Sequence, residues 1–139
     1  MRHIFLDTNV IIDFLAGREP FATDAAYLFD AAVSGTCKIY VCALSFNNIW
    51  YILSQTLKDT RTIGLLKELE KMTLIAPVTQ KIIRQALDGK FKDFEDAVQY
   101  FSAQGLGIIN ALVTRNSKDF KNSELPIMSP AEAVAFLRV

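Results

Sequence analysis

Short apolar runs alternate with amphipathic stretches along the whole chain. The runs are four to six residues long, almost wholly apolar, and end at polar residues or proline, which is typical of strands buried on both faces. The pattern predicts strands at residues 3–6, 38–42, 73–76 and 108–113, with a shorter one at 127–128.

The stretches between these runs carry apolar residues at three- and four-residue steps, as amphipathic helices do. Gly17 is available to end the first helix, Pro20 to begin the second, and Ser45 and Ser129 to cap two later ones. The predicted helices cover residues 10–16, 20–33, 44–53, 79–87 and 93–104, and a last helix follows Ser129.

Alternating strands and helices indicate an α/β three-layer sandwich, with a mainly parallel central sheet flanked by helices. Parallel strands require crossover connections, and these are usually helical. We see no linker, repeat or low-complexity stretch, so residues 1–139 are expected to form one domain.

Composition adds little about function. The chain is 51% hydrophobic, which is ample for a packed core, and its fifteen basic and fifteen acidic residues give no net charge. It shows neither a signal-peptide pattern nor an apolar stretch of about 20 residues, so we expect a cytoplasmic protein without a membrane segment. Cys37 and Cys42 lie in the apolar stretch 37–42 and His3 in the first predicted strand. All three are interpreted as structural, with the cysteines reduced.

Polar residues gather where the predicted strands end. In a parallel sheet the carboxyl ends of the strands face one edge, so residues distant in sequence converge there. Asp7 follows the first strand, and Asn48 lies in the helix after the second. Asp93 and Asp96 start the helix before the fourth strand, and Asn116 and Asp119 follow that strand. Clustered oxygen donors suit Mg²⁺ or Mn²⁺, and a cation of this kind supports phosphodiester hydrolysis without a histidine or cysteine nucleophile.

Three segments carry a family resemblance. DTNVIIDFL near the N-terminus, DFEDAVQYFSA before the fourth strand and VTRNSKDF after it resemble the PIN domain, the ribonuclease fold of the toxin in VapBC-type toxin–antitoxin modules. The resemblance covers essentially the whole chain, in the expected order. It implies an acidic cleft that binds one or two Mg²⁺ or Mn²⁺ ions and cleaves RNA endonucleolytically.

The resemblance also implies roles for individual residues. Asp7 matches the first acidic position and Asp96 the third, and Asp93 matches an accessory acid. Asn48 stands at the second position, usually glutamate, and Asn116 at the fourth, where Asp119 from the same turn can supply a carboxylate. Thr8, Asn9 and Thr114 match polar residues that support the site, and we expect Thr8 or Asn9 to hold the Asp7 loop by local hydrogen bonds.

Plainer interpretations stand beside these. Asp7 and Asp93 are also suitable N-caps, and Asp96 a first-turn partner of the helix dipole. Asn48 could face solvent. Asp13 is interpreted as a surface or interface residue, and Trp50 and Tyr51 as core or dimer contacts.

Basic residues flank the predicted cleft. Arg115, Lys118 and Lys121 lie in the turn beside Asn116, and Lys90 and Lys92 precede Asp93. Such charges usually mark a solvated face, but beside a metal cleft they can hold an RNA backbone.

The resemblance therefore predicts a metal-dependent endoribonuclease, the toxin of a bacterial type II toxin–antitoxin pair. Toxins of this kind are expected to form homodimers and to be silenced by a cognate antitoxin. The alternative is a catalytically weakened or inactive PIN module that binds RNA or a protein partner. A phosphate-receiving signalling domain is disfavoured, because only one acid ends the first strand.

Overall fold

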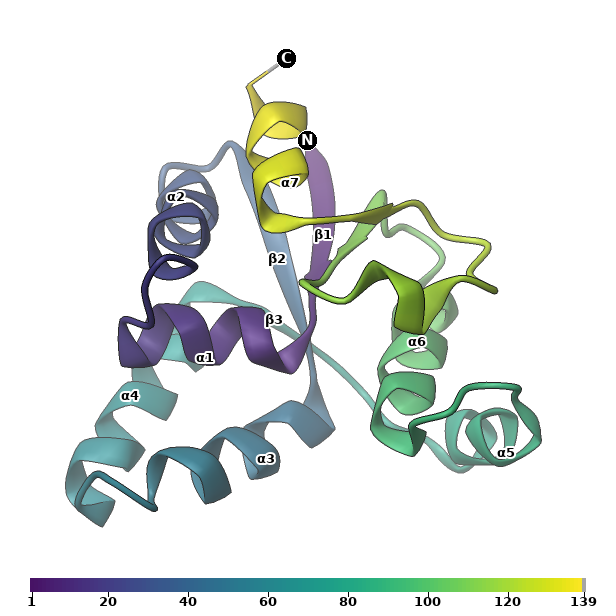
Figure 1. Ribbon diagram of the computed structural model, residues 1–139, viewed down its shortest axis with the longest axis horizontal. Coiled ribbons are helices and arrows are strands. Elements are labelled where there is room, and N and C mark those ends of the chain that lie inside the picture. Colours follow the sequence, from purple (N-terminus) through teal and green to yellow (C-terminus); the bar gives the residue numbers. More distant parts are fainter. Residues whose placement is uncertain (139) are drawn as a thin grey trace.

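The computed structural model describes residues 1–138 as an α/β sandwich around one parallel sheet (Figure 1). The sheet has five strands in the order β3-β2-β1-β4-β5, and every neighbouring pair is parallel. The strands are β1 (Arg2–Leu6), β2 (Cys37–Cys42), β3 (Leu74–Ala76), β4 (Ala111–Val113) and β5 (Ile127–Met128). The predicted fold class is confirmed.

Helices cover both faces of this sheet, as the two separate core clusters show. The helices are α1 (Thr8–Ala16), α2 (Ala22–Val33), α3 (Ala43–Leu53), α4 (Asp59–Met72), α5 (Gln80–Asp88), α6 (Phe94–Leu106) and α7 (Pro130–Leu137), and a 3₁₀ helix, η1 (Ser117–Phe120), follows β4. Helices α1, α2, α4 and α7 share one cluster, whereas α5 and α6 pack on the opposite face.

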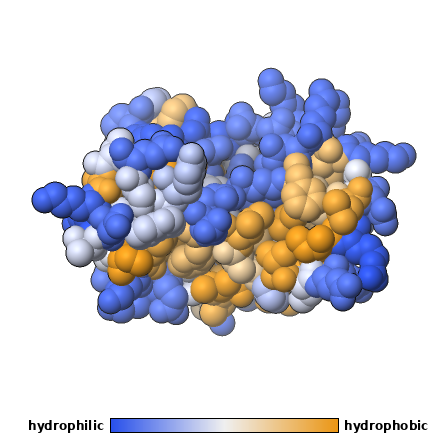
Figure 2. Space-filling view, turned by 90° about the horizontal axis from the view of Figure 1, so that it is seen from below, coloured by the Kyte–Doolittle hydropathy of each residue, from blue (hydrophilic) through white to orange (hydrophobic). Residues whose placement is uncertain are grey.

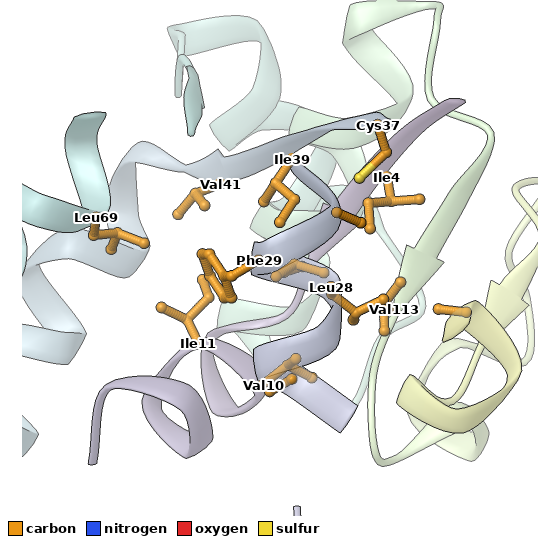
Figure 3. Packing of buried hydrophobic residues seen from close by; sticks show 14 of the residues in the cluster. Ile4, Val10, Ile11, Leu28, Phe29, Cys37, Ile39, Val41, Leu69 and Val113 are labelled. Atoms are coloured by element: carbon orange, nitrogen blue, oxygen red, sulfur yellow. The ribbon is translucent and has the colours of Figure 1, made fainter. Parts of the chain in front are cut away.

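Alternate residues of the central strand point to opposite faces of the sheet. Ile4 and Leu6 of β1 lie in the cluster with α1 and α2 (Figure 3), whereas Phe5 lies in the cluster with α6. All three are fully buried. A strand covered on both faces must be apolar throughout, which explains why residues 4–6 form an unbroken apolar run.

Some of the residues predicted to begin or end helices do so in the structure, and others do not. Gly17 ends α1 in the left-handed conformation, and Ser129 caps α7 through a capping box with Glu132. Three predictions are wrong. Helix α2 begins at Ala22, two residues after Pro20; α3 begins at Ala43, so Ser45 lies inside the helix; and β4 covers only the last three of the six residues predicted as strand.

The interpretation of the cysteines and His3 agrees with the structure. Cys37 and Cys42 are buried free thiols, and the His3 ring contacts the Tyr40 hydroxyl through Nδ1 at 2.9 Å. In the part of the chain described, every helix is too short or too polar to cross a membrane.

Candidate functional site

Asp7 lies at the carboxyl end of β1, in the middle of the sheet, and is only 5% exposed. Its carboxylate accepts hydrogen bonds from Gln99 Nε2 at 3.0 Å and from the Thr114 hydroxyl at 2.8 Å. Strands β1 and β4 pair Leu6 with Val113, so the next residues, Asp7 and Thr114, leave the sheet side by side. The site is thus anchored by strand register.

Asp7 occupies the N-cap position of α1 but makes no side-chain cap. The interpretation of Asp7 as a helix cap is therefore wrong, because its carboxylate bonds to Gln99 and Thr114 instead. Burial raises the pKa of Asp7, and the charge of Glu95 raises it further, whereas the hydrogen bonds from Thr114 and Gln99 lower it. The net shift is upward.

The first turn of α6 brings further carboxylates to Asp7. Asp93 is the N-cap of α6 and accepts a hydrogen bond from the Asp96 backbone N–H at 3.0 Å, so its predicted capping role is confirmed. Burial, followed by the charges of Asp7, Asp93, Asp119 and Glu95, raises the pKa of Asp96 to about 7. Negative charges from β1, α6 and η1 therefore meet around Asp96.

A cleft of about 460 Å³ opens beside these carboxylates. The loop between α5 and α6 forms one side, and η1 with the residues after it forms the other. The cleft is lined by Lys90, Phe91, Lys92, Asp93, Asp96, Lys118, Asp119, Lys121 and Asn122. Four lysines and three aspartates thus line the same cleft.

The two predicted amide positions differ in their surroundings. Asn48 is half-buried on α3, one turn after the fully buried Ser45. Asn116 is exposed in the turn after β4, where its backbone N–H donates to the Thr114 hydroxyl at 3.1 Å. Asn116 therefore supports the residue that holds Asp7.

Thr8 stabilises the site through contacts with distant elements and not through a local turn. Its hydroxyl lies 2.7 Å from that of Ser45 and donates to Glu95 Oε2 at 2.9 Å, and its backbone N–H donates to Gln99 Oε1 at 3.1 Å. The predicted local hydrogen bonding by Thr8 is therefore wrong. Asn9, the other residue proposed for this role, is half-buried.

Ser45, Glu95 and Gln99 belong to this network, and sequence reasoning did not select them. One signal was available. Gln99 lies three residues after Asp96 and four after Glu95, which places it on the same face of α6. Ser45 precedes Asn48 by one turn in the same way on α3.

Asp13 is buried, with 1% exposure, so its interpretation as a surface or interface residue is wrong. Its carboxylate pairs with Arg115 Nε at 2.8 Å and Arg18 Nε at 3.0 Å. The Arg115 guanidinium also lies 4.0 Å from the centre of the Phe21 ring. Arg115 therefore joins the turn after β4 to α1, and its guanidinium is engaged within the protein.

Phe94, an apolar residue of the helix predicted at 93–104, is 48% exposed at the start of α6. Tyr51 on α3, interpreted as a core or dimer contact, is 67% exposed and so lies outside the core, which leaves the dimer contact as a prediction.

The sequence model of the PIN domain family matches residues 3–118. The chain belongs to the PIN domain family. The matched part of the PIN domain runs from β1 into η1 and includes Asp7, Asn48, Asp96 and Asn116. Asp119 follows the matched segment directly.

Relatives of this PIN domain cover nearly its whole length. Ribonuclease VapC1 of Aquifex aeolicus (strain VF5) is 23% identical over 134 residues, which are 93% of this chain and 91% of the relative. The DNA-bound VapBC structure from Salmonella typhimurium contains a similar chain, with a TM-score of 0.71, 15% identity, and coverage of 94% of this chain and 99% of that one.

A third similar structure is VapC20 of Mycobacterium tuberculosis, described as a Sarcin-Ricin loop cleaving toxin. Its TM-score is 0.61 at 16% identity, with 78% of this chain and 86% of that chain covered. At these identities the structural likeness establishes the fold of the PIN domain.

Proposed function

We propose that the protein is a metal-dependent endoribonuclease that hydrolyses RNA phosphodiester bonds, and that it is the cytoplasmic toxin of a bacterial type II toxin–antitoxin pair. The observation that carries this proposal is that Asp96, on which the charge of the buried Asp7 acts, lines a cleft shared with four lysines in a PIN domain. Similarity to Ribonuclease VapC1 over 93% of the chain supports the same activity.

The donor set suits Mg²⁺ or Mn²⁺. Hard divalent cations prefer carboxylate oxygens, and the repulsion that raises the pKa of Asp96 is relieved when a cation lies among these charges. Within residues 1–138, no three side chains of His, Cys, Asp or Glu are already arranged to hold a metal. A hydrated Mg²⁺ does not require such a cage, because it commonly keeps several waters and binds one or two carboxylates directly.

Each polar residue then has a role. Asp7 and Asp96 bind the cation, with Asp93 and Asp119 contributing charge from α6 and η1. Gln99 and Thr114 fix the orientation of the Asp7 carboxylate. Asn48 and Asn116 act as neutral ligands or position water. A bound divalent cation lowers the pKa of a coordinated water and stabilises charge on the scissile phosphate.

The cleft lysines are proposed to hold the RNA backbone. Lys118 and Lys121 line one side of the cleft and Lys90 and Lys92 the other, so both pairs are available to phosphates of a strand bound in the cleft. Such contacts position a strand without reading its sequence. Arg115, predicted from the sequence to join them, is left out of this role because its guanidinium pairs with Asp13.

Protein partners are also part of the proposal. The VapBC structure from Salmonella typhimurium contains a similar chain, which supports a cognate antitoxin as a partner here. Tyr51 and Ile52 of α3 are 67% and 38% exposed, and Figure 2 shows hydrophobic side chains gathered in a band on the face viewed from below Figure 1. A homodimer that covers part of this face would remove that apolar surface from water.

Cleavage of a mixed RNA pool tests the activity. The wild-type protein is expected to cut RNA with Mg²⁺ or Mn²⁺ and to stop when EDTA is added, and Asp7→Asn is expected to be inactive. Absence of metal-dependent cutting by the wild type, or equal cutting by Asp7→Asn, would contradict the proposal. RNA binding that survives EDTA without products would instead identify a non-catalytic PIN module.

A further inference from the structure

Glu95 occupies the second position of α6, between Phe94 and Asp96, and is half-buried. Its side chain is directed toward the sheet and contacts the residue that follows Asp7. Glu95 Oε2 accepts a hydrogen bond from the Thr8 hydroxyl at 2.9 Å. The Glu95 carboxylate therefore lies beside the centre of the site and not on the outer face of α6.

Gln99 fixes this arrangement from the next turn of α6. Its side-chain amide donates to Asp7 Oδ1 at 3.0 Å through Nε2 and accepts from the Thr8 backbone N–H at 3.1 Å through Oε1. Glu95 and Gln99 are four residues apart and share one face of the helix. This face of α6 is thus held against the start of α1 at two successive turns.

The direction of the hydrogen bonds shows how Glu95 is held. The Thr8 hydroxyl has one proton and two acceptors within reach, Glu95 Oε2 at 2.9 Å and Gln99 Oε1 at 3.4 Å, and the shorter contact directs the proton to Glu95. The Ser45 hydroxyl, 2.7 Å from that of Thr8 and fully buried, must then donate to Thr8. The chain of donors runs from Ser45 through Thr8 to Glu95, and leaves Glu95 Oε1 available to a ligand.

Such an outer shell is typical of carboxylates that bind metals, because hydrogen bonds from neighbours fix the orientation of the ligating group. Glu95 directly precedes Asp96 on α6 and contacts Thr8, which directly follows Asp7.

The hydrogen bonds through Thr8 link Glu95 to Ser45 of α3. Ser45 precedes Asn48 by one turn on α3, and Asn48 offers only a neutral amide oxygen there. We propose that Glu95 is a direct ligand of the divalent cation and supplies, from α6, the carboxylate that α3 does not provide. This assignment rests on the proposed metal-dependent nuclease function.

Manganese titration of the full-length protein by isothermal calorimetry tests the assignment. Glu95→Gln preserves the shape of the side chain and removes its charge. We expect it to weaken Mn²⁺ binding by about tenfold or more, because loss of an outer-shell partner alone typically costs about tenfold and loss of a direct ligand costs at least as much. Glu70→Gln makes the same chemical change on the exposed face of α4 and is expected to bind Mn²⁺ as the wild type does. Binding by Glu95→Gln within about twofold of the wild type would overturn the assignment.

Two further variants complete the design. Glu95→Asp keeps the charge but draws the carboxylate back by one methylene, so a ligand role predicts weakened binding, whereas wild-type affinity would show a purely electrostatic role and overturn the assignment. Asp96→Asn separates the two proposals. If Asp96→Asn weakens Mn²⁺ binding and Glu95→Gln does not, only the role of Glu95 is refuted. If the wild-type protein binds no Mn²⁺, the proposed metal-dependent function is refuted as well.

Discussion

The Thr114 hydroxyl donates a 2.8 Å hydrogen bond to Asp7 across the ends of β4 and β1. The two residues are 107 positions apart in sequence. They are neighbours in space because Asp7 directly follows Leu6, Thr114 directly follows Val113, and Leu6 and Val113 are paired between β1 and β4. The same Thr114 oxygen accepts the Asn116 backbone N–H. One hydroxyl therefore orients the central carboxylate and shapes the turn after β4.

Replacing Thr114 by valine is expected to destabilise the protein by about 1.5–3 kcal/mol, the usual contribution of a hydrogen bond to a charged group. Valine has nearly the same shape, so the loss isolates the hydroxyl. Urea unfolding measures the change in the free energy of unfolding. Thr60→Val, on the exposed start of α4, is the control and should stay within about 0.5 kcal/mol of the wild type. A Thr114→Val loss no larger than that of the control would contradict the role of this hydrogen bond.

The stability of the metal-free protein is expected to fall as the pH rises from about 4 to about 7. Asp96 has a folded-state pKa of about 7 against 3.8 in the unfolded chain, so in this range the folded state binds the extra proton. The contribution of this extra proton to the free energy of unfolding is fully present below pH 3.8 and is lost as the pH rises through about 7. Thermal unfolding in EDTA across this range measures the effect.

Asp96→Asn is expected to remove most of this pH dependence and to raise the melting temperature of the metal-free protein above pH 7. With allowance for solvent screening, we expect a rise of about 5 °C, corresponding to about 1 kcal/mol in a domain of this size. Asp30→Asn, on the exposed side of α2, is the matched control and should keep the wild-type pH profile. An Asp96→Asn profile parallel to that of the wild type would show that Asp96 titrates normally.

Charge reversal at Lys118 and Lys121 is expected to weaken binding of single-stranded RNA, measured without divalent cations so that the RNA stays intact. Loss of each phosphate contact should lower the slope of log K against log salt by about 0.7. Lys58→Glu with Lys67→Glu makes the same change in net charge on exposed residues beside and within α4. Equal RNA binding by the two double variants would refute a backbone contact in the cleft.

Replacing Asp13 by asparagine is expected to cost about 3 kcal/mol, the low end of the range for breaking a buried ion pair, because Arg18 and Arg115 are partly exposed and can reach water. Urea unfolding again provides the measurement, with Asp30→Asn as control. A loss below about 0.5 kcal/mol would show that the paired arginines do not depend on this carboxylate.

The fold could be predicted because its signals are local. Residues 4–6 are apolar on both faces since helices cover both sides of β1, and Gly17 and Ser129 mark helix ends through their own backbone and side-chain chemistry. The exact strand length at β4 could not be predicted in this way. Ile108 is as apolar as the strand residues but is 48% exposed, and only pairing with β1 distinguishes it from Ala111–Val113.

The acidic centre was visible in sequence through Asp7 at the end of the first strand and the aspartates before and after the fourth strand, but the residues that support it were not. Gln99 is neutral and lies in a helix, and its function depends on Asp7, 92 positions away. Asp13 lies among apolar residues on α1, and its partner Arg115 is 102 positions away. Contacts of this kind depend on the packing of elements and leave no local pattern in either segment.

The central claim is that the carboxyl end of β1 and the first turn of α6 form a metal centre. A crystal soaked in Mn²⁺ and measured at a wavelength with strong manganese anomalous scattering tests it most directly. The account predicts an anomalous peak between the carboxylates of Asp7 and Asp96, and no such peak in crystals of Asp96→Asn. A saturating soak that leaves this position empty, or that places manganese only at another surface, would contradict the account.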